Sequence, residues 1–361
     1  MSESPRKFTP RIRARIMLAL VTTLASALVL MTVQGASAAS EPPTKTLPGE
    51  GSWMATGIHS QDSIDVADDP TTESTIAMWR SNTPGDNTIA WQVEQDGFAY
   101  DIQSANAQSE NAPSVIAGDN FFMAFHRGLQ NQIWYAFGSF ATPTRGSNFH
   151  LSSWFQIPGV TTSGTPVATV VSGNVMVAYR GETNNNVYLA HARLPQGGAV
   201  LPTAWVNDGS LPANTLSSPS LTTLEGRPVL VYNRGGQLYR RISSGVTGTW
   251  GAETQITTNI PGVVGRPAVM AAGNTLDVVS LGGPRHSDGG FSLYRNAYSM
   301  NQLGQLNSLT GWTEDPSGYE SASAPCLWAE VTAAVFIVNM VIRGLRNNGQ
   351  MQVKQLSGFP R

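Results

Sequence analysis

Residues 165–190 have the sequence TPVATVVSGNVMVAYRGETNNNVYLA, which predicts three short β-strands. β-Branched residues dominate 167–171, and the tripeptide Ser-Gly-Asn at 172–174 supplies turn chemistry before a second strand at 175–179. A polar turn then leads to a third strand at 187–190. Two hairpins of this length cannot bury a core alone, so copies of the unit must stack on one another.

Copies of this unit recur along the chain with a period near 50 residues. First strands open at prolines spaced 53, 53, 48 and 58 residues apart, namely Pro113, Pro166, Pro219, Pro267 and Pro325. Arginine ends the second strand in five units, at Arg80, Arg127, Arg180, Arg234 and Arg343. In the remaining unit, Ser-Leu-Gly at 280–282 fills this slot without an arginine. Such a period, with four short strands in each unit, is typical of a β-propeller.

Tryptophan marks the fourth strand of four units, at Trp154, Trp205, Trp250 and Trp312. The last unit ends at Arg361 after three strands, whereas an unpartnered Trp53 precedes the first unit. We therefore predict an all-β fold, a six-bladed β-propeller of four-stranded antiparallel sheets. Its last blade is closed by the N-terminal strand around Trp53, which removes an open sheet edge.

The N-terminal segment 1–38 has the pattern of a signal peptide. Five basic residues precede an apolar run at 16–33, and Ala-Ser-Ala at 36–38 gives a cleavage site. The alternative is an uncleaved anchor helix, because the run approaches the length of a membrane span. We expect cleavage and secretion, then a tether at 39–51 and a single propeller domain at 52–361. The expected units are 60–110, 111–163, 164–216, 217–264, 265–322, and 323–361 completed by 52–59.

Charge and cysteine content limit the partners of the mature chain. The leader holds five of the 22 basic residues and one of the 24 acidic ones, which leaves a formal net charge of −6. A mildly acidic, charge-poor chain is a poor candidate for binding nucleic acid or, after signal cleavage, a membrane. The single Cys326 excludes an internal disulfide and occupies a first-strand slot, where a small buried residue is expected. We expect a monomer.

The arginines should lie around one rim of the propeller, the face that carries the turns after the second strands and the connections between blades. Arginine can bind a carboxylate with two parallel hydrogen bonds, and aromatic neighbours can stack on sugar rings. The alternative is a structural role, because a residue repeated at one position can join each blade to the next. The candidate ligand-binding residues are Trp79, Arg80, His126, Arg127, Tyr179, Arg180, Glu182, Asn233, Arg234 and Arg343.

The Thr-Ser-x-x-Pro entries, Ala-Tyr-Arg-Gly turns and fourth-strand tryptophans resemble repeats of secreted actinobacterial propellers, which are akin to sialidase-like and lectin-like propellers. This resemblance covers about residues 53–361 and implies a binding or glycosidase function. The Asp box of sialidases is not intact: residues 243–250, SSGVTGTW, lack its Asp and central Gly. Tyr319 and Glu320 are neighbours, but adjacent strand residues point to opposite faces, which argues against a nucleophile pair.

No catalytic residue, metal ligand or cofactor is assigned from the sequence. His286 and Asp288 form the most exposed candidate pair, in the long insertion of the fifth unit, although a solvated loop is the better explanation. The acidic run Asp62, Asp65, Asp68 and Asp69 lacks the spacing of a calcium loop, so we expect a solvated acidic loop.

The sequence therefore favours a secreted, non-catalytic carbohydrate-binding propeller of lectin-like type, with an extracellular glycan as ligand. One alternative is a protein-interaction propeller that modulates, or is a partner or substrate of, a secreted protease or cell-wall protein. A third hypothesis is a sialidase-like glycoside hydrolase.

Overall fold

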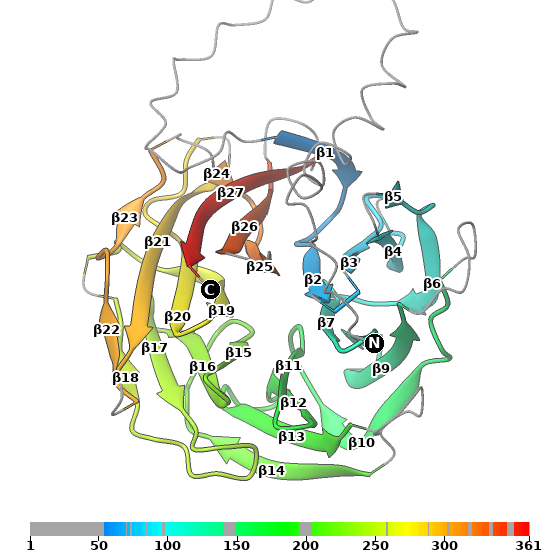
Figure 1. The fold of residues 1–361 in the computed structure, drawn as a ribbon, viewed down its shortest axis with the longest axis horizontal. Coiled ribbons are helices and arrows are strands. Elements are labelled where there is room, and N and C mark those ends of the chain that lie inside the picture. Colours follow the sequence, from blue (N-terminus) through cyan, green and yellow to red (C-terminus); the bar gives the residue numbers. More distant parts are fainter. Residues whose placement is uncertain are drawn as a thin grey trace, which may run out of the picture.

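The computed structural model describes residues 54–360, except 70, 73, 84, 96–97, 141–148, 195–203, 258, 288, 302–303, 317–319, 332–334 and 345–349. All regular secondary structure in the described residues is β, and six antiparallel sheets surround a central axis (Figure 1). The expected leader, tether and Trp53 lie outside the described residues. Within the described part, no helix is long and apolar enough to cross a membrane. The predicted six-bladed β-propeller is confirmed.

Blades 1 to 3 follow one another around the ring, each running from an inner strand to an outer one. Blade 1 contains β2 (Asp65–Asp69), β3 (Ser74–Arg80), β4 (Thr88–Gln95), β5 (Phe98–Ala99) and β6 (Gln103–Gln108). Blade 2 contains β7 (Ser114–Gly118), β8 (Phe121–Arg127), β9 (Gln132–Ser139) and β10 (Phe155–Thr161). Blade 3 contains β11 (Val167–Val171), β12 (Asn174–Arg180), β13 (Val187–Arg193) and β14 (Trp205–Leu211).

Blades 4 to 6 complete the ring. Blade 4 contains β15 (Ser220–Leu224), β16 (Arg227–Arg234), β17 (Gln237–Ile242) and β18 (Thr254–Gln255). Blade 5 contains β19 (Val264–Ala272), β20 (Thr275–Gly282), β21 (Phe291–Met300), β22 (Leu306–Ser308), β23 (Thr313–Glu314) and β24 (Glu320–Ser321). Blade 6 contains β25 (Cys326–Val331), β26 (Val335–Arg343), β27 (Gln350–Pro360) and β1 (Met54–His59).

The outer edge of two blades is built from short pieces. In blade 1, both β5 and β6 pair with β4, and in blade 5 the strands β22, β23 and β24 all pair with β21. In blade 6, the outer position is taken by β1, which pairs antiparallel with β27 through Met54 opposite Val353 (Figure 1). This pairing brings the two ends of the described chain into one sheet.

The acidic run of the first unit is not a solvated loop, and this expectation was wrong. Asp65–Asp69 is β2, the inner strand of blade 1. Asp69 is fully buried, where its carboxylate accepts hydrogen bonds from Thr71 N at 3.0 Å and Asn120 N at 2.7 Å. Asp65 accepts one from Val115 N of blade 2 at 2.9 Å. Because backbone amides satisfy these carboxylates, aspartate can replace the β-branched residues usual at such positions.

The turn predicted inside blade 3 is confirmed by its backbone. Ser172 and Gly173 have φ values of 48° and 71° and join β11 to β12 as a two-residue hairpin. Positive φ at both central residues matches the right-handed twist of paired strands. The strands are therefore in register from Val171 opposite Asn174 to Val167 opposite Ala178.

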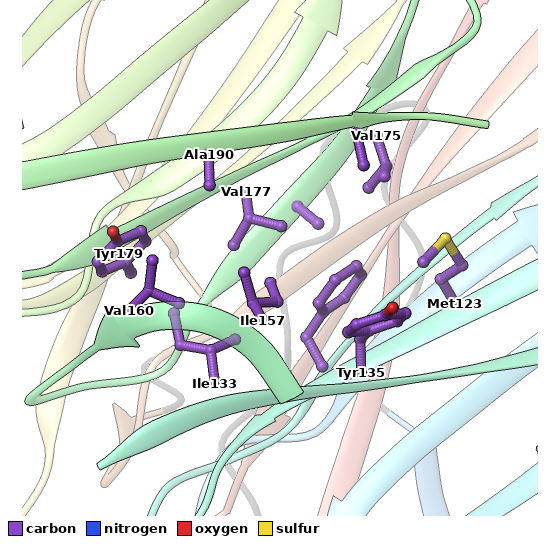
Figure 2. Close-up of a cluster of buried hydrophobic side chains, with 12 residues drawn as sticks. Met123, Ile133, Tyr135, Ile157, Val160, Val175, Val177, Tyr179 and Ala190 are labelled. Carbon is purple, nitrogen blue, oxygen red and sulfur yellow. The ribbon is translucent and has the colours of Figure 1, made fainter. Parts of the chain in front are cut away.

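Apolar side chains fill the space between neighbouring blades. Figure 2 shows one such cluster, in which Met123, Ile133 and Tyr135 of blade 2 face Val175 and Val177 of blade 3. The tryptophans predicted to mark the fourth strands add to these contacts. Trp205 lies edge-on to Tyr135, with ring centroids 5.2 Å apart. The indoles of two others reach back to the preceding blade, where Trp154 donates to Ala105 O and Trp312 to Ile256 O, both at 2.7 Å.

Candidate functional site

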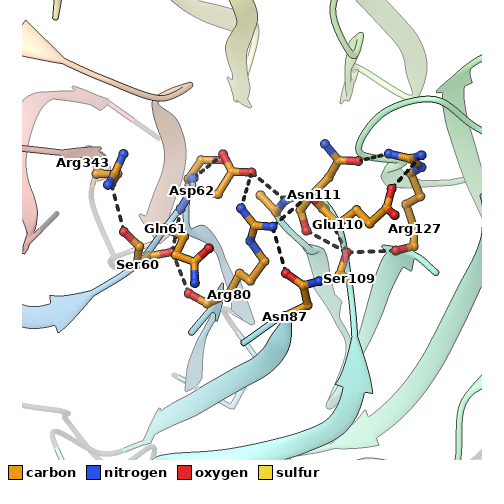
Figure 3. Close-up of polar contacts among 12 residues, drawn as sticks. Ser60, Gln61, Asp62, Arg80, Asn87, Ser109, Glu110, Asn111, Arg127 and Arg343 are labelled. Carbon is orange, nitrogen blue, oxygen red and sulfur yellow. Dashed lines mark hydrogen bonds and ion pairs between the residues drawn. The ribbon is translucent and has the colours of Figure 1, made fainter. Parts of the chain in front are cut away.

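The five repeated arginines end β3, β8, β12, β16 and β26, as the sequence predicted. Figure 3 shows the environment of the first two. Arg80 donates to Glu110 O at 2.9 Å, in the connection between blades 1 and 2. Arg127 donates to Asn111 Oδ1 at 2.9 Å and forms an ion pair with Glu110 Oε2 at 2.8 Å. Both guanidinium groups thus bind the same inter-blade connection from opposite sides.

Two further arginines have comparable contacts at other blade junctions. Arg180 donates through Nε to Ser163 Oγ at 2.8 Å and through Nη2 to Ser163 O at 3.2 Å. Its Nη1 donates to Leu216 O, so this side chain bridges the connections on both sides of blade 3. Arg343 of blade 6 donates to Ser60 O at 2.9 Å, before blade 1. Burial, followed by the charge of Arg127, lowers the pKa of Arg180.

Arg234 differs from the other four because its partners lie in its own blade. It forms an ion pair with Glu253 at 2.6 Å, and its guanidinium lies 4.0 Å from the centre of the Tyr239 ring. About a third of its side chain is exposed, more than for Arg80 or Arg127. Stacking on an aromatic ring holds the planar group in place.

Hydroxyl groups complete these junctions on the backbone side. In four blades, a serine or threonine before the inner strand donates to the carbonyl oxygen of the arginine that ends the second strand. The pairs are Ser60–Arg80, Ser109–Arg127, Thr162–Arg180 and Ser321–Arg343, at 2.9 to 3.3 Å. Four of the five arginines therefore join blades to the connections between them, as the structural alternative expects, and Arg234 is the exception.

The residues that precede four of these arginines do not flank a ligand-accessible surface. Trp79, His126, Tyr179 and Asn233 are only 3–8% exposed, because alternate strand residues point between the blades. Burial lowers the pKa of His126 to about 4, so its ring is neutral near pH 7. Their burial leaves little side-chain surface for stacking on a ligand. Glu182 is exposed and accepts a hydrogen bond from Asn131 Nδ2 of the neighbouring blade.

A cavity of about 320 Å³ lies on the propeller axis, lined by the six inner strands. Its polar residues include Asp65, Arg266 and Cys326, and the Cys326 thiol lies 3.2 Å from Asp65 Oδ1. Burial raises the pKa of Asp65, partly offset by Arg266, and burial raises the pKa of Cys326 well above its usual value. The thiol therefore stays protonated and behaves as the small buried residue that the sequence predicted.

A second cavity of about 410 Å³ lies at the junction of blades 5 and 6. Leu293 of β21 and Met340 and Leu356 of blade 6 form its apolar wall, and these three belong to one buried cluster. Leu309, 54% exposed, and the exposed Thr313 lie at its solvent side. The pocket therefore has buried apolar side chains on one side and is open to solvent beside Leu309 and Thr313.

Two ion pairs fix the polar side of this inter-blade pocket. Arg295 contacts Asp277 Oδ1 through Nε and Nη2, both at 2.8 Å, and Lys354 of blade 6 binds both carboxylate oxygens of Asp315 at 3.1 Å. Burial raises the pKa of Asp277, and the Arg295 charge offsets part of this rise. The pocket therefore offers an apolar wall beside rigidly held charged groups, without any residue from the predicted set.

No group of three or more His, Cys, Asp or Glu side chains within the described residues could hold a metal ion. Asp288 and Tyr319, named in the sequence interpretation, lie outside the described part. Sequence reasoning also missed Arg295 and Lys354, because neither belongs to a repeated position. The long insertion of the fifth unit, at 282–290, does not mark them either, because it does not line this pocket.

Neither a family model nor a curated protein matches this chain. Solved structures do. An Aleuria aurantia lectin mutant in complex with Fucα1-6GlcNAc aligns with a TM-score of 0.54 at 12% identity, covering 83% of this chain and 94% of the lectin. An oxidoreductase (glucose dehydrogenase) from Thermus thermophilus aligns with a TM-score of 0.51 at 12% identity, covering 85% and 100%. An exo-1,5-α-L-arabinanase from a bovine ruminal metagenomic library reaches 0.42 at 13%, covering 71% and 97%. At these identities, the first two similarities establish the propeller fold that the chain shares with them.

Proposed function

We propose that this chain is a secreted carbohydrate-binding propeller whose principal site is the pocket between blades 5 and 6. The proposal depends on one observation, the combination in that pocket of an apolar wall with fixed charged groups. The predicted signal peptide at 1–38 supports an extracellular location. N-terminal sequencing of the exported protein tests that part, because cleavage after Ala38 gives a chain that starts at Ala39.

The chemistry of a sugar ring matches such a pocket. A pyranose presents apolar C–H faces together with hydroxyl groups that both donate and accept hydrogen bonds. Leu293, Met340 and Leu356 supply apolar surface, and Arg295, Asp315 and Lys354 supply donors and acceptors already held in place. A volume of about 410 Å³ falls within the usual range for small-molecule sites.

The Aleuria aurantia lectin supports the choice of ligand class, because the same fold carries a fucosylated disaccharide there. Fucosylated oligosaccharides are therefore the first compounds to test. The repeated arginines do not support a sialidase-like carboxylate site. Four of their guanidinium groups bind groups of the blade connections, and that of Arg234 pairs with Glu253.

A glycan array probed with the mature chain tests the proposal, followed by calorimetry on the best ligand. Thr313→Phe fills the solvent side of the pocket and should abolish binding. Leu309→Ala removes an apolar contact and should weaken binding about tenfold, which corresponds to about 1.4 kcal/mol. Leu216→Ala is the matched control, because Leu216 is also exposed, at 71%, but lies between blades 3 and 4.

An array without any bound glycan contradicts the proposal, as does a ligand whose affinity Thr313→Phe leaves unchanged. Recovery of a specific secreted protein together with an empty array would instead favour the protein-interaction alternative.

A further inference from the structure

Three polar side chains of blade 5 form a linear chain of contacts on the rim. His286 Nε2 lies 3.2 Å from Ser292 Oγ, and His286 Nδ1 lies 3.1 Å from Glu320 Oε1. Ser292 is in β21, Glu320 is in β24, and His286 is in the turn between β20 and β21. None of the three belongs to the pocket between blades 5 and 6.

The local fold places these residues together. Ser292 and Glu320 are directly opposite each other in the antiparallel pair β21–β24, so their side chains lie on the same face of the sheet. The turn that carries His286 is closed by its own backbone, with His286 N donating to Gly290 O and Gly289 N donating to His286 O, both at 2.9 Å. Gly289 has a φ of 97°, which suits only glycine, so the turn sets the imidazole between the other two groups.

From this arrangement we infer a second activity: Ser292, His286 and Glu320 form a nucleophile–base–acid triad for acyl transfer from carboxylic esters. The order of atoms carries the inference. A carboxylate at Nδ1 holds the proton on that nitrogen, so Nε2 is left to accept the proton of the serine hydroxyl. The distance from His286 to Ser292 and the distance from His286 to Glu320 are both within hydrogen-bond reach, as nucleophile–base and base–acid contacts require.

The balanced reaction needs only the ester and water. Ser292 Oγ bonds to the acyl carbon while its proton passes to His286 Nε2, and Glu320 stabilises the imidazolium through Nδ1–H. The bond from the acyl carbon to the alkoxide oxygen then breaks, and the alkoxide leaves with the proton from Nε2. Water repeats the sequence, regenerates the serine and releases the carboxylic acid.

Burial limits the ester that can react. Ser292 is 9% exposed, the side chain of Glu320 is 18% exposed, and that of His286 is 37% exposed. The nucleophile is therefore recessed behind its base, which favours a short acyl group such as acetyl over a bulky one. Arg285, exposed in the same turn, places a positive charge beside this approach.

A fluorophosphonate ester tests the triad, because it labels an activated serine by forming an Oγ–P bond and losing fluoride. The experiment uses the mature full-length chain, with intact mass and peptide mapping as readouts. We expect one adduct, located on Ser292, and none in Ser292→Ala. Ser299→Ala is the matched control on the same strand and should label as the wild type does.

Two substitutions separate a catalytic arrangement from a structural one. His286→Asn removes the base and should slow labelling, and hydrolysis of p-nitrophenyl acetate, by at least about 100-fold. Glu320→Gln should slow both by about tenfold or more, with partial recovery in Glu320→Asp. Circular dichroism of each variant establishes that it is folded. An unlabelled folded wild type, an adduct that persists in Ser292→Ala, or a folded His286→Asn with the wild-type rate would each overturn the inference.

Discussion

Blades 3 and 5 differ in how the end of the second strand is used. In blade 3, Arg180 ends β12 and donates hydrogen bonds to the connections on both sides of the blade. In blade 5, Leu281 occupies this slot, is 3% exposed and packs in a cluster shared with blade 6. The polar groups at this edge of blade 5 are His286, Ser292 and Glu320, which contact one another instead.

In a repeated fold, the copy that lacks the arginine can use its rim side chains for a reaction and not for joining blades. An arginine that joins two blades forms hydrogen bonds with the hydroxyl and carbonyl groups around it. A rim with such an arginine in every blade would therefore leave few polar groups available to a ligand. Where apolar packing joins the blades, the rim groups can pair among themselves in a reactive order. Substitutions at the two slots test whether they carry these separate roles.

The largest effect is expected for Leu281→Ala. Truncation of a buried leucine leaves a cavity and costs about 2–5 kcal/mol of unfolding free energy. Urea unfolding followed by tryptophan fluorescence measures this loss. Leu309→Ala is the matched control and should stay within about 0.5 kcal/mol, because its side chain is exposed. A loss below about 1 kcal/mol for Leu281→Ala would mean that blade 5 is not joined through this slot.

The residue before this slot can be compared in the same way. In blade 2 it is His126, which is buried like Tyr179 of blade 3 and Ser280 of blade 5. Its pKa is about 4 in the folded chain, against 6.5 for a fully hydrated histidine, so the unfolded chain binds the proton more tightly. Stability is therefore lost as pH falls from about 6.5 to 4, by about 3 kcal/mol from this group.

His126→Phe should remove this part of the pH dependence, measured as the difference from wild type in unfolding free energy at pH 7 and pH 4.5. Working with the difference cancels the contributions of Asp65 and Asp277, whose pKa values are raised. His150→Gln is the control, because His150 is exposed. Equal slopes in His126→Phe and wild type would show that His126 is not held neutral by burial.

A smaller effect is expected for Arg180→Ala, about 2 kcal/mol. The substitution removes three hydrogen bonds, but the carbonyl of Leu216 regains water because that residue is exposed. Arg180→Lys should recover only part of the loss, since an ammonium group cannot reproduce the planar fork. Thermal unfolding of the wild type and the two variants ranks their stabilities. An unchanged melting temperature in Arg180→Ala would show that Arg180 does not stabilise blade 3.

The sequence was sufficient for the fold because its repeated residues each have a local cause. Prolines directly precede four inner strands and Pro267 lies within β19. Arginines end five second strands, and tryptophans lie in or before four outer strands, so the count of six followed from spacing. The inner strand Asp65–Asp69 was missed because its carboxylates are satisfied by amides from blade 2 and by its own turn, which no local pattern reveals.

The sites were harder to predict for a geometric reason. The pocket between blades 5 and 6 depends on the direction in which Arg295 and Lys354 point, and these residues are 59 positions apart. His286 and Glu320 were each noted as candidates, but their contact requires the antiparallel pairing of β21 with β24. The spacing placed the five arginines at the ends of second strands, and their hydrogen-bond partners became evident only in the structure.

The smallest effect on stability is expected for His286→Asn and Glu320→Gln, below about 1 kcal/mol each. The contact between His286 and Glu320 joins partly exposed side chains and so contributes little to folding, and the amide of Gln keeps the shape of the carboxylate. Unfolding free energies of the wild type and both variants, measured in one buffer, make the comparison direct. A loss near that of Arg180→Ala would show that this contact joins the turn to β24 as a strut does. A negligible loss, combined with slower labelling of Ser292, would mean that the polar groups of blade 5 are held by the fold but are not needed for it.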